Sequence, residues 1–137
     1  MGEIGEVKLN IEVEVNTTED SNKVRVAVQK IFGNLDLVEV KNGDQSRLVS
    51  NAEGLEALEA FHELLRKERI LDAARKMLFN GLKGKTITFF LNKQAAYVGH
   101  ISFSQPVGES PLGPIRVEVQ CDNPKGLIDG LTPKTRQ

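Results

Sequence analysis

The sequence VKLNIEVEV at residues 7–15 decides the fold. Five apolar side chains alternate along it with four polar ones. Successive side chains of a β-strand point to opposite faces, so this pattern predicts a strand with one apolar face and one polar face. Such a strand packs on the core with one face and turns the other toward water or a partner. We therefore expect a sheet that is covered on one side only.

Other segments extend this sheet and cover it. Apolar patterns predict further strands at residues 35–40, 45–50, 85–91, 100–104 and 115–121. Apolar residues spaced by three and four predict helices, which we place around residues 24–31, 55–65, 70–78, 92–98 and after 123. The first helix is expected to begin with a threonine cap at Thr17 or Thr18 and to end at Gly33. A loop is expected at residues 104–114 and a frayed tail at residues 132–137.

Two local signals predict how these elements connect. Asn42 and Gly43 are expected to form the centre of a two-residue hairpin turn, in which both central residues need positive φ. The return strand, residues 45–50, is mostly polar, and we expect it to be the short one. The apolar stripes of the two middle helices fall out of phase near residues 66–69, so a break between two helices is expected there.

The order of elements predicts the fold class. The half-polar strands favour an antiparallel sheet with helices on one face, which is an α+β sandwich. A chain of 137 residues is of the usual length for one domain, and no repeat or linker divides it. We predict a single domain, residues 1–137, with an antiparallel sheet of about five strands.

Composition excludes several classes of protein. The net charge of −1 argues against a generally basic nucleic-acid coat protein. The single cysteine, Cys121, excludes an internal disulfide and a multi-cysteine zinc site. No apolar run approaches the roughly 20 residues of a membrane span, and Glu3 and Glu6 stand where a signal peptide would be apolar. We expect a cytoplasmic protein without a membrane partner.

Complete catalytic and metal motifs are missing from the sequence. Gly84-Lys85-Thr86 resembles the end of a P-loop, but Phe79 stands where that motif needs glycine, and a strand follows where a helix should. The two histidines, His62 and His100, lack metal-ligand spacing. We predict no catalytic residues, no metal and no cofactor. An enzyme built on Cys121 with His62 or His100 is the third functional hypothesis.

Charge is distributed unevenly along the chain. Residues 1–63 carry a net charge of −7, whereas residues 64–93 carry +6. A basic stretch of this kind can contact phosphates, which makes RNA binding the alternative hypothesis. Its candidate contacts are Arg66, Arg69, Arg75, Lys76, Lys83 and Lys85. RNA binding loses support if the acidic residues of the preceding helix interleave with them, namely Glu53, Glu56, Glu59 and Glu63.

A polar cluster is expected where the strand at residues 85–91 ends. Asn92 can cap the short helix that follows, and Tyr97 can bury its ring while its hydroxyl stays in water. Lys93 is expected at the surface. A small site for an anion or a partner's backbone is the functional interpretation of this cluster, and its candidate residues are Asn92, Lys93, Gln94, Tyr97 and His100.

Three stretches resemble an archaeal family. Residues 69–75 (RILDAAR), 91–99 (LNKQAAYVG) and 111–115 (PLGPI) are similar to uncharacterised protein family two hundred and one, a domain of unknown function. The resemblance extends from Thr18 to Pro133. It implies a five-stranded antiparallel sheet with five helices, in an RRM-related arrangement similar to the domain of the large-subunit ribosomal protein that binds the smallest ribosomal RNA. It implies no catalytic or binding residues.

The first functional hypothesis is a non-catalytic interaction domain that acts through protein contacts. It rests on the missing catalytic motifs and on the half-open sheet. An unknown protein partner is expected, a homodimer is compatible with these features, and RNA is the alternative partner.

Overall fold

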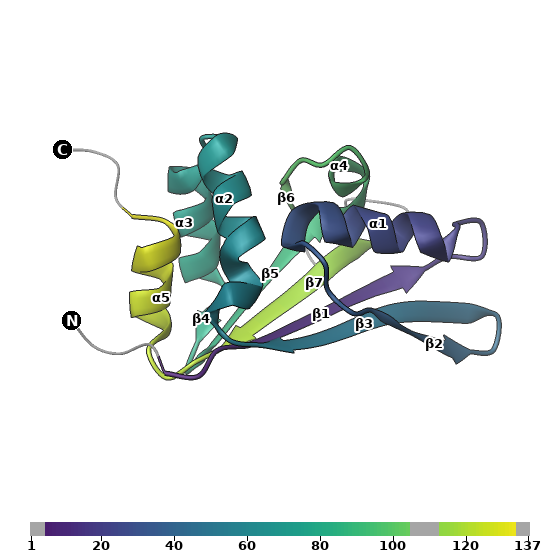
Figure 1. Cartoon of the computed structure of the whole chain (residues 1–137), viewed down its shortest axis with the longest axis horizontal. Helices are drawn as coiled ribbons and strands as arrows, with labels where there is room; N and C mark the ends of the chain where they lie inside the picture. The colour runs from purple at the N-terminus through teal and green to yellow at the C-terminus, as the bar shows by residue number, and fades with distance from the viewer. Residues whose placement is uncertain (1–4, 105–112, 134–137) are drawn as a thin grey trace.

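The computed structural model describes residues 5–104 and 113–133. In this part of the chain, seven strands form one open antiparallel sheet, in the order β2-β3-β1-β7-β5-β4, with β6 paired to β5. Five α-helices lie on one face of the sheet and leave the other face open (Figure 1). The predicted α+β class with a half-covered antiparallel sheet is therefore confirmed, although the sheet has more strands than the expected five.

The elements follow one another along the chain with short connections. The strands are β1 (Lys8–Val15), β2 (Val38–Asn42), β3 (Gln45–Glu53), β4 (Leu82–Lys83), β5 (Thr86–Asn92), β6 (Phe103–Ser104) and β7 (Pro114–Gln120). The helices are α1 (Ser21–Phe32), α2 (Glu59–Lys67), α3 (Leu71–Asn80), α4 (Lys93–Tyr97) and α5 (Pro124–Leu131), with a 3-10 turn η1 (Leu55–Leu58) before α2. No helix of the described residues is long and apolar enough to cross a membrane.

Strand β1 lies inside the sheet, between β3 and β7. Its apolar residues are buried under the helices, and its polar residues lie on the open face, as the alternation predicts. The core above it includes a stack of three aromatic rings. The Phe61 ring of α2 lies 5.2 Å from that of Phe32 and 5.4 Å from that of Phe89, and Phe61 is fully buried. The Phe61 ring of α2 therefore packs against both α1 and β5.

The predicted break between the middle helices is confirmed. Helix α2 ends at Lys67 and α3 begins at Leu71. Between them, Arg69 has a φ of 58°, in the left-handed region that stops a helix. The start of α1 differs from the expectation, because Asp20 rather than a threonine is the cap: its side chain accepts a hydrogen bond from the Asn22 backbone N–H at 2.9 Å.

The hairpin β2–β3 differs from the prediction in two respects. Asn42 pairs with Gln45, so the turn residues are Gly43 and Asp44, and of these only Gly43 has positive φ. Strand β3 has nine residues and is the longest strand of the sheet, whereas the sequence suggested a short one. Its polar composition misleads because β3 pairs with the whole of β1 and buries only Leu48 and Ser50.

Other boundaries moved by a few residues. Strand β2 begins at Val38 rather than at residue 35, and the expected strand at residues 100–104 contains only the two residues of β6. The two-residue strand β4 was not predicted. Residues 105–112 of the expected loop and residues 134–137 of the expected tail lie outside the described residues.

Candidate nucleic-acid interface and buried polar network

The end of β5 leads directly into a buried polar network. Asn92 caps α4, because its Oδ1 accepts a hydrogen bond from the Ala95 backbone N–H at 2.9 Å, as predicted. The next residue, Lys93, is not at the surface as expected. Its side chain is completely buried, with an exposed fraction of 0%. A lysine is buried in this way only when its charge is paired and hydrogen-bonded.

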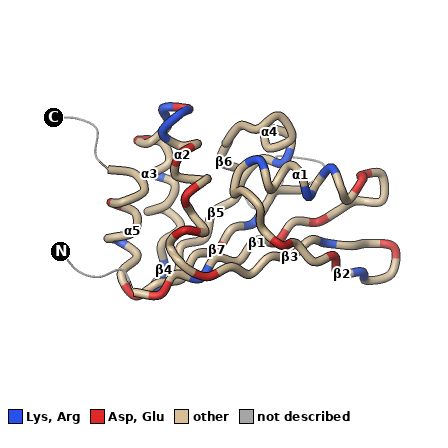
Figure 2. Tube along the Cα trace, in the orientation of Figure 1, with Lys and Arg blue, Asp and Glu red and all other residues tan. Residues whose placement is uncertain are grey.

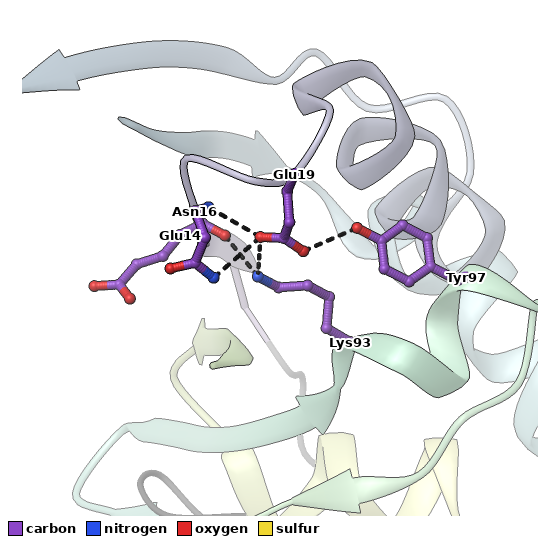
Figure 3. A network of polar contacts seen from close by, with 5 residues as sticks. All are labelled: Glu14, Asn16, Glu19, Lys93 and Tyr97. Atoms are coloured by element: carbon purple, nitrogen blue, oxygen red, sulfur yellow. Dashed lines mark hydrogen bonds and ion pairs between the residues drawn. The ribbon is translucent and has the colours of Figure 1, made fainter. Parts of the chain in front are cut away.

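Lys93 reaches from β5 to β1 across the end of β7. The pairing of β1 with β7 stops at Val13 and Ile115, so the Glu14 carbonyl lies one residue beyond this ladder, although β7 itself continues to Pro114. Lys93 Nζ donates a hydrogen bond to this carbonyl at 2.7 Å and forms an ion pair with Glu19 Oε1 at 3.0 Å (Figure 3). The ammonium group thus supplies a hydrogen bond just beyond the last pair of the β1–β7 ladder.

Glu19 is the centre of the network. Only 6% of its side chain is exposed, and its Oε1 also accepts hydrogen bonds from the backbone N–H and the side-chain Nδ2 of Asn16, at 2.9 and 3.2 Å. Burial acts to raise the pKa of Glu19. The hydrogen bonds from Asn16, Lys93 and Tyr97 and the charge of Lys93 outweigh burial and lower the pKa below its ordinary value. Glu19 is therefore a carboxylate at neutral pH.

Tyr97 completes the network from α4. Its hydroxyl donates a hydrogen bond to Glu19 Oε2 at 3.0 Å, whereas the sequence suggested a hydroxyl in water (Figure 3). Burial and this contact with the Glu19 carboxylate raise the pKa of Tyr97 to about 12. The network connects the β1–α1 loop to α4, and its lysine is closed to solvent.

The other two residues of the predicted cluster point elsewhere. Gln94 is exposed. The His100 ring is 65% exposed, and its Nδ1 lies 2.5 Å from Glu68 Oε2. Glu68 Oε1 also accepts a hydrogen bond from the Ile101 backbone N–H at 3.2 Å. His100 therefore helps to attach the segment after α4 to the end of α2 and does not extend the Lys93–Glu19 network.

Two of the six predicted RNA contacts are bound within the protein. Arg75 forms an ion pair with Asp129 of α5 at 2.7 Å and donates a hydrogen bond to the Thr132 carbonyl at 2.8 Å. Its guanidinium lies 5.0 Å from the centre of the Phe79 ring. Lys85 lies 3.5 Å from Asp122, in an exposed ion pair. Arg75 thus fastens α5 to α3.

The remaining basic residues fall into separate groups. Arg66, Lys67 and Arg69 are all exposed, and they lie where α2 ends and the turn to α3 begins. We call these three residues the basic tip. Figure 2 shows Lys and Arg positions gathered at this end of α2. Lys76 is exposed on α3, and Lys83 and Lys85 lie beside the β4–β5 turn, at the other end of the helix pair (Figure 1).

The acidic residues expected on one helix face precede the basic tip. Glu56 lies in η1, and Glu59 and Glu63 lie in α2, so acidic residues occupy the beginning of this segment and basic residues its end (Figure 2). This order of charges suits the helix dipole. Glu63 lines a shallow depression between α1 and α2 together with Arg66 and Lys67, whereas Glu53 belongs to β3. The basic tip therefore borders acidic residues: Glu63 lines the same depression as Arg66 and Lys67, and Glu68 lies between Lys67 and Arg69 in the sequence.

The cysteine and the histidines give the enzyme hypothesis no geometric support. Cys121 is 5% exposed at the end of the last strand, and burial raises the pKa of its thiol. His62 lines a groove between α2 and α5 whose other walls include Leu58 and Leu127. Among residues 5–104 and 113–133, no group of three His, Cys, Asp or Glu side chains is placed to hold a metal ion.

A family model and two related proteins each match most of this chain. A family model described as RNA binding matches residues 8–121. A UPF0201 protein of Sulfurisphaera tokodaii is 53% identical over 128 residues, which make up 93% of this chain and 88% of that protein. A UPF0201 protein of Saccharolobus solfataricus is 45% identical over 129 residues, 94% of this chain and 89% of that protein.

Two solved structures also match most of this chain. The crystal structure of a UPF0201 protein from Methanococcus jannaschii matches with a TM-score of 0.81 and 33% identity, over 94% of this chain and 95% of that one. A DUF54 protein from Sulfolobus solfataricus, 15% identical, matches with a TM-score of 0.66 over 91% of this chain and 96% of that one, so it has the same fold. The family model and these relatives together show that the chain belongs to the archaeal UPF0201 family.

Proposed function

We propose that this protein is a non-catalytic domain that binds the phosphate backbone of structured RNA through the basic tip. The observation that carries the proposal is the exposure of Arg66, Lys67 and Arg69 together at the end of α2. In the described part of the chain, no carboxylate lies within ion-pair distance of them. Exposed cations of this kind release counterions when they meet phosphates, which drives association.

The basic tip contains two of the six candidate contacts that the sequence suggested, Arg66 and Arg69, together with Lys67, which was not among the six. Arg75 and Lys85 are paired within the protein, and Lys83 lies at the other end of the helix pair. The description of the family model as RNA binding supports the RNA hypothesis over the protein-contact hypothesis that ranked first on sequence. Similarity to the ribosomal-protein domain and a cytoplasmic location agree with this proposal and stay predictions.

The open face of the sheet is a less suitable surface for RNA. Phe90, half-buried, is the aromatic side chain that the described strands present there. Opposite it in the next strand is Arg116, but Glu12 and Glu118 lie on the same face and repel phosphate. Splayed single-stranded bases need several aromatic platforms. Contact with phosphates of folded RNA at the basic tip needs none.

The experiment compares two double variants with the same change of charge. Arg66→Glu with Lys67→Glu reverses two charges of the basic tip, and Lys83→Glu with Lys85→Glu reverses two charges beside the β4–β5 turn. Binding of a fluorescent RNA hairpin is followed by anisotropy over a series of salt concentrations. We expect the wild type to show a log–log salt slope of about −2 to −3, because about three cations meet phosphates.

The variant with Arg66→Glu and Lys67→Glu should lose most of the affinity for the RNA hairpin and most of its salt dependence. The variant with Lys83→Glu and Lys85→Glu should retain both. Equal loss in the two variants would mean that only net charge matters, which contradicts a defined interface. Absence of binding by the wild type at low salt would reject RNA binding and return the protein-contact hypothesis to first place.

A further inference from the structure

Strand β2 forms one edge of the sheet and carries exposed apolar side chains. It pairs with β3 on one side only. The exposed fractions of Val38 and Val40 are 64% and 39%. Both lie on the open face, because Val38 is opposite Val49 and Val40 is opposite Arg47 of β3. An edge strand with unpaired peptide groups is a template for another strand.

The hairpin geometry indicates which peptide groups of β2 point outward. Asn42 and Gln45 close a two-residue turn, and the closing pair of such a turn is a hydrogen-bonded pair. Hydrogen-bonded and non-hydrogen-bonded pairs alternate along an antiparallel ladder. Val40 therefore directs its peptide groups toward β3. Glu39 and Lys41 direct theirs away from the sheet.

We propose that two copies of this chain associate edge to edge, through antiparallel pairing of their β2 strands centred on Val40. In this register Glu39 of each copy lies opposite Lys41 of the other, so the pairing contains two Glu39–Lys41 ion pairs. Val40 lies opposite its own counterpart, and Val38 lies opposite Asn42. Figure 2 shows the acidic and basic positions close together along β2. Opposite charges directly across an antiparallel ladder stabilise the pair.

Other registers are disfavoured by the same residues. Centring the pairing on Glu39 places two glutamates opposite each other, and centring it on Lys41 places two lysines opposite each other. Like charges at directly opposed positions are destabilising. A shift by a single residue would join the open face of one copy to the helix-covered face of the other. The sequence of β2 is therefore self-complementary in the register centred on Val40.

This arrangement has a simple structural result. The two sheets become one continuous sheet, with the helices of both copies on the same side. Val38 and Val40 of each copy then lie near the centre of the combined open face instead of at its edge. Glu39 and Lys41 satisfy each other's peptide groups and charges. The second copy thus covers the part of the strand that the monomer leaves unpaired.

Disulfide crosslinking tests the register. The Val40→Cys variant places two thiols at a non-hydrogen-bonded pair, where Cα atoms are about 4.5 Å apart, within reach of a disulfide. The Val38→Cys variant separates its two thiols by four residues along the strand, about 13 Å, which a disulfide cannot span. We expect oxidation to crosslink Val40→Cys, and to crosslink an equal mixture of Val38→Cys and Asn42→Cys, but not Val38→Cys alone. Wild type, whose Cys121 is buried, is the control.

Charge exchange tests the pairing without a crosslink. Glu39→Lys and Lys41→Glu each turn two attractive pairs into two repulsive ones, and the double variant restores opposite charges with an unchanged composition. In sedimentation experiments over a range of concentrations, we expect each single variant to weaken the dimer at least about tenfold and the double variant to recover it. Glu6→Lys and Lys125→Glu, exposed elsewhere, are matched controls that should change nothing. Thermal melts confirm that each variant is folded.

Three results would overturn the proposal. A wild-type protein that stays monomeric at every concentration, with no crosslink in Val40→Cys, would leave this edge to a strand of another protein. Equal crosslinking of Val38→Cys alone would indicate random collision instead of the proposed register. A dimer that survives both single charge reversals would have to form through another surface.

Discussion

The basic stretch at residues 64–93 contains one buried cation, Lys93, and a group of exposed cations, the basic tip, and the two have opposite environments. Lys93 is completely buried and makes its contacts inside the protein, with Glu14 and Glu19. The basic tip, Arg66, Lys67 and Arg69, is exposed where a helix ends. Sequence alone presents both as positive charges in one basic run. The difference teaches that the position of a cation relative to the end of a strand or a helix decides whether it serves the fold or remains available for a partner.

The strongest test of this comparison is Lys93→Ala. Removal of the ammonium group leaves the Glu19 carboxylate buried without its counter-charge and the Glu14 carbonyl without this donor. Breaking a buried pair in this way costs about 3–5 kcal/mol of unfolding free energy. Urea denaturation measures it. A loss below about 1 kcal/mol, as expected of a surface residue, would show that the network contributes little.

Arg75→Ala tests a cation that is only partly buried. Its side chain is 18% exposed and connects α3 to Asp129 and Thr132 at the end of α5. We expect a loss of about 2 kcal/mol, because hydrogen bonds to charged groups contribute about 1.5–3 kcal/mol each and part of this is screened by solvent. Hydrogen exchange should show the loss concentrated in α5. Uniform loss of protection over the sheet would contradict a local role for Arg75.

The Glu19 carboxylate predicts an acid-dependent part of the stability. Its pKa in the folded protein lies below the ordinary value of 4.5, so the folded state binds this proton less readily than the unfolded chain. The contribution of Glu19 to the unfolding free energy is therefore complete above about pH 4.5 and is lost as the pH falls through the folded-state pKa. Denaturation curves over a series of acidic buffers should show a smaller pH dependence for Glu19→Gln than for the wild type. Identical slopes would exclude Glu19 as a contributor.

The smallest effect on stability is expected at the basic tip. Lys67→Ala removes an exposed side chain and should change the unfolding free energy by less than about 0.5 kcal/mol. Its effect should appear instead in the salt dependence of RNA binding, where one phosphate contact fewer lowers the log–log slope by about 0.7–0.9. If Lys67→Ala clearly changed the melting temperature and left RNA binding unchanged, this residue of the basic tip would stabilise the fold instead of contacting a partner.

Local patterns predicted the parts of the fold that depend on local geometry. The alternation in β1 gave its buried face, and the phase change near Arg69 gave the break between α2 and α3. The length of β3 was missed because its stability comes from pairing with β1, and such pairing leaves no apolar pattern on a mostly polar strand. The two-residue β4 is too short to produce any periodic signal.

The candidate site was predictable only in part, for the same reason. The cap at Asn92 depends on a residue three positions away, and the sequence shows it. The burial of Lys93 depends on Glu19, which is 74 residues away, and on the β1–β7 ladder stopping one residue before Glu14. A charged residue after a strand suggests the surface unless its distant partner is known.

The reach of Lys93 across the sheet has a consequence for the order of folding. Two of its acceptors are 79 and 74 residues away in sequence, and it can meet them only after β1, β7 and β5 have been aligned. Contacts that close such long loops carry a large entropic cost and form late. We therefore expect the network to form in the last step, after the strands have paired. Substitutions there should accelerate unfolding while leaving the refolding rate nearly unchanged.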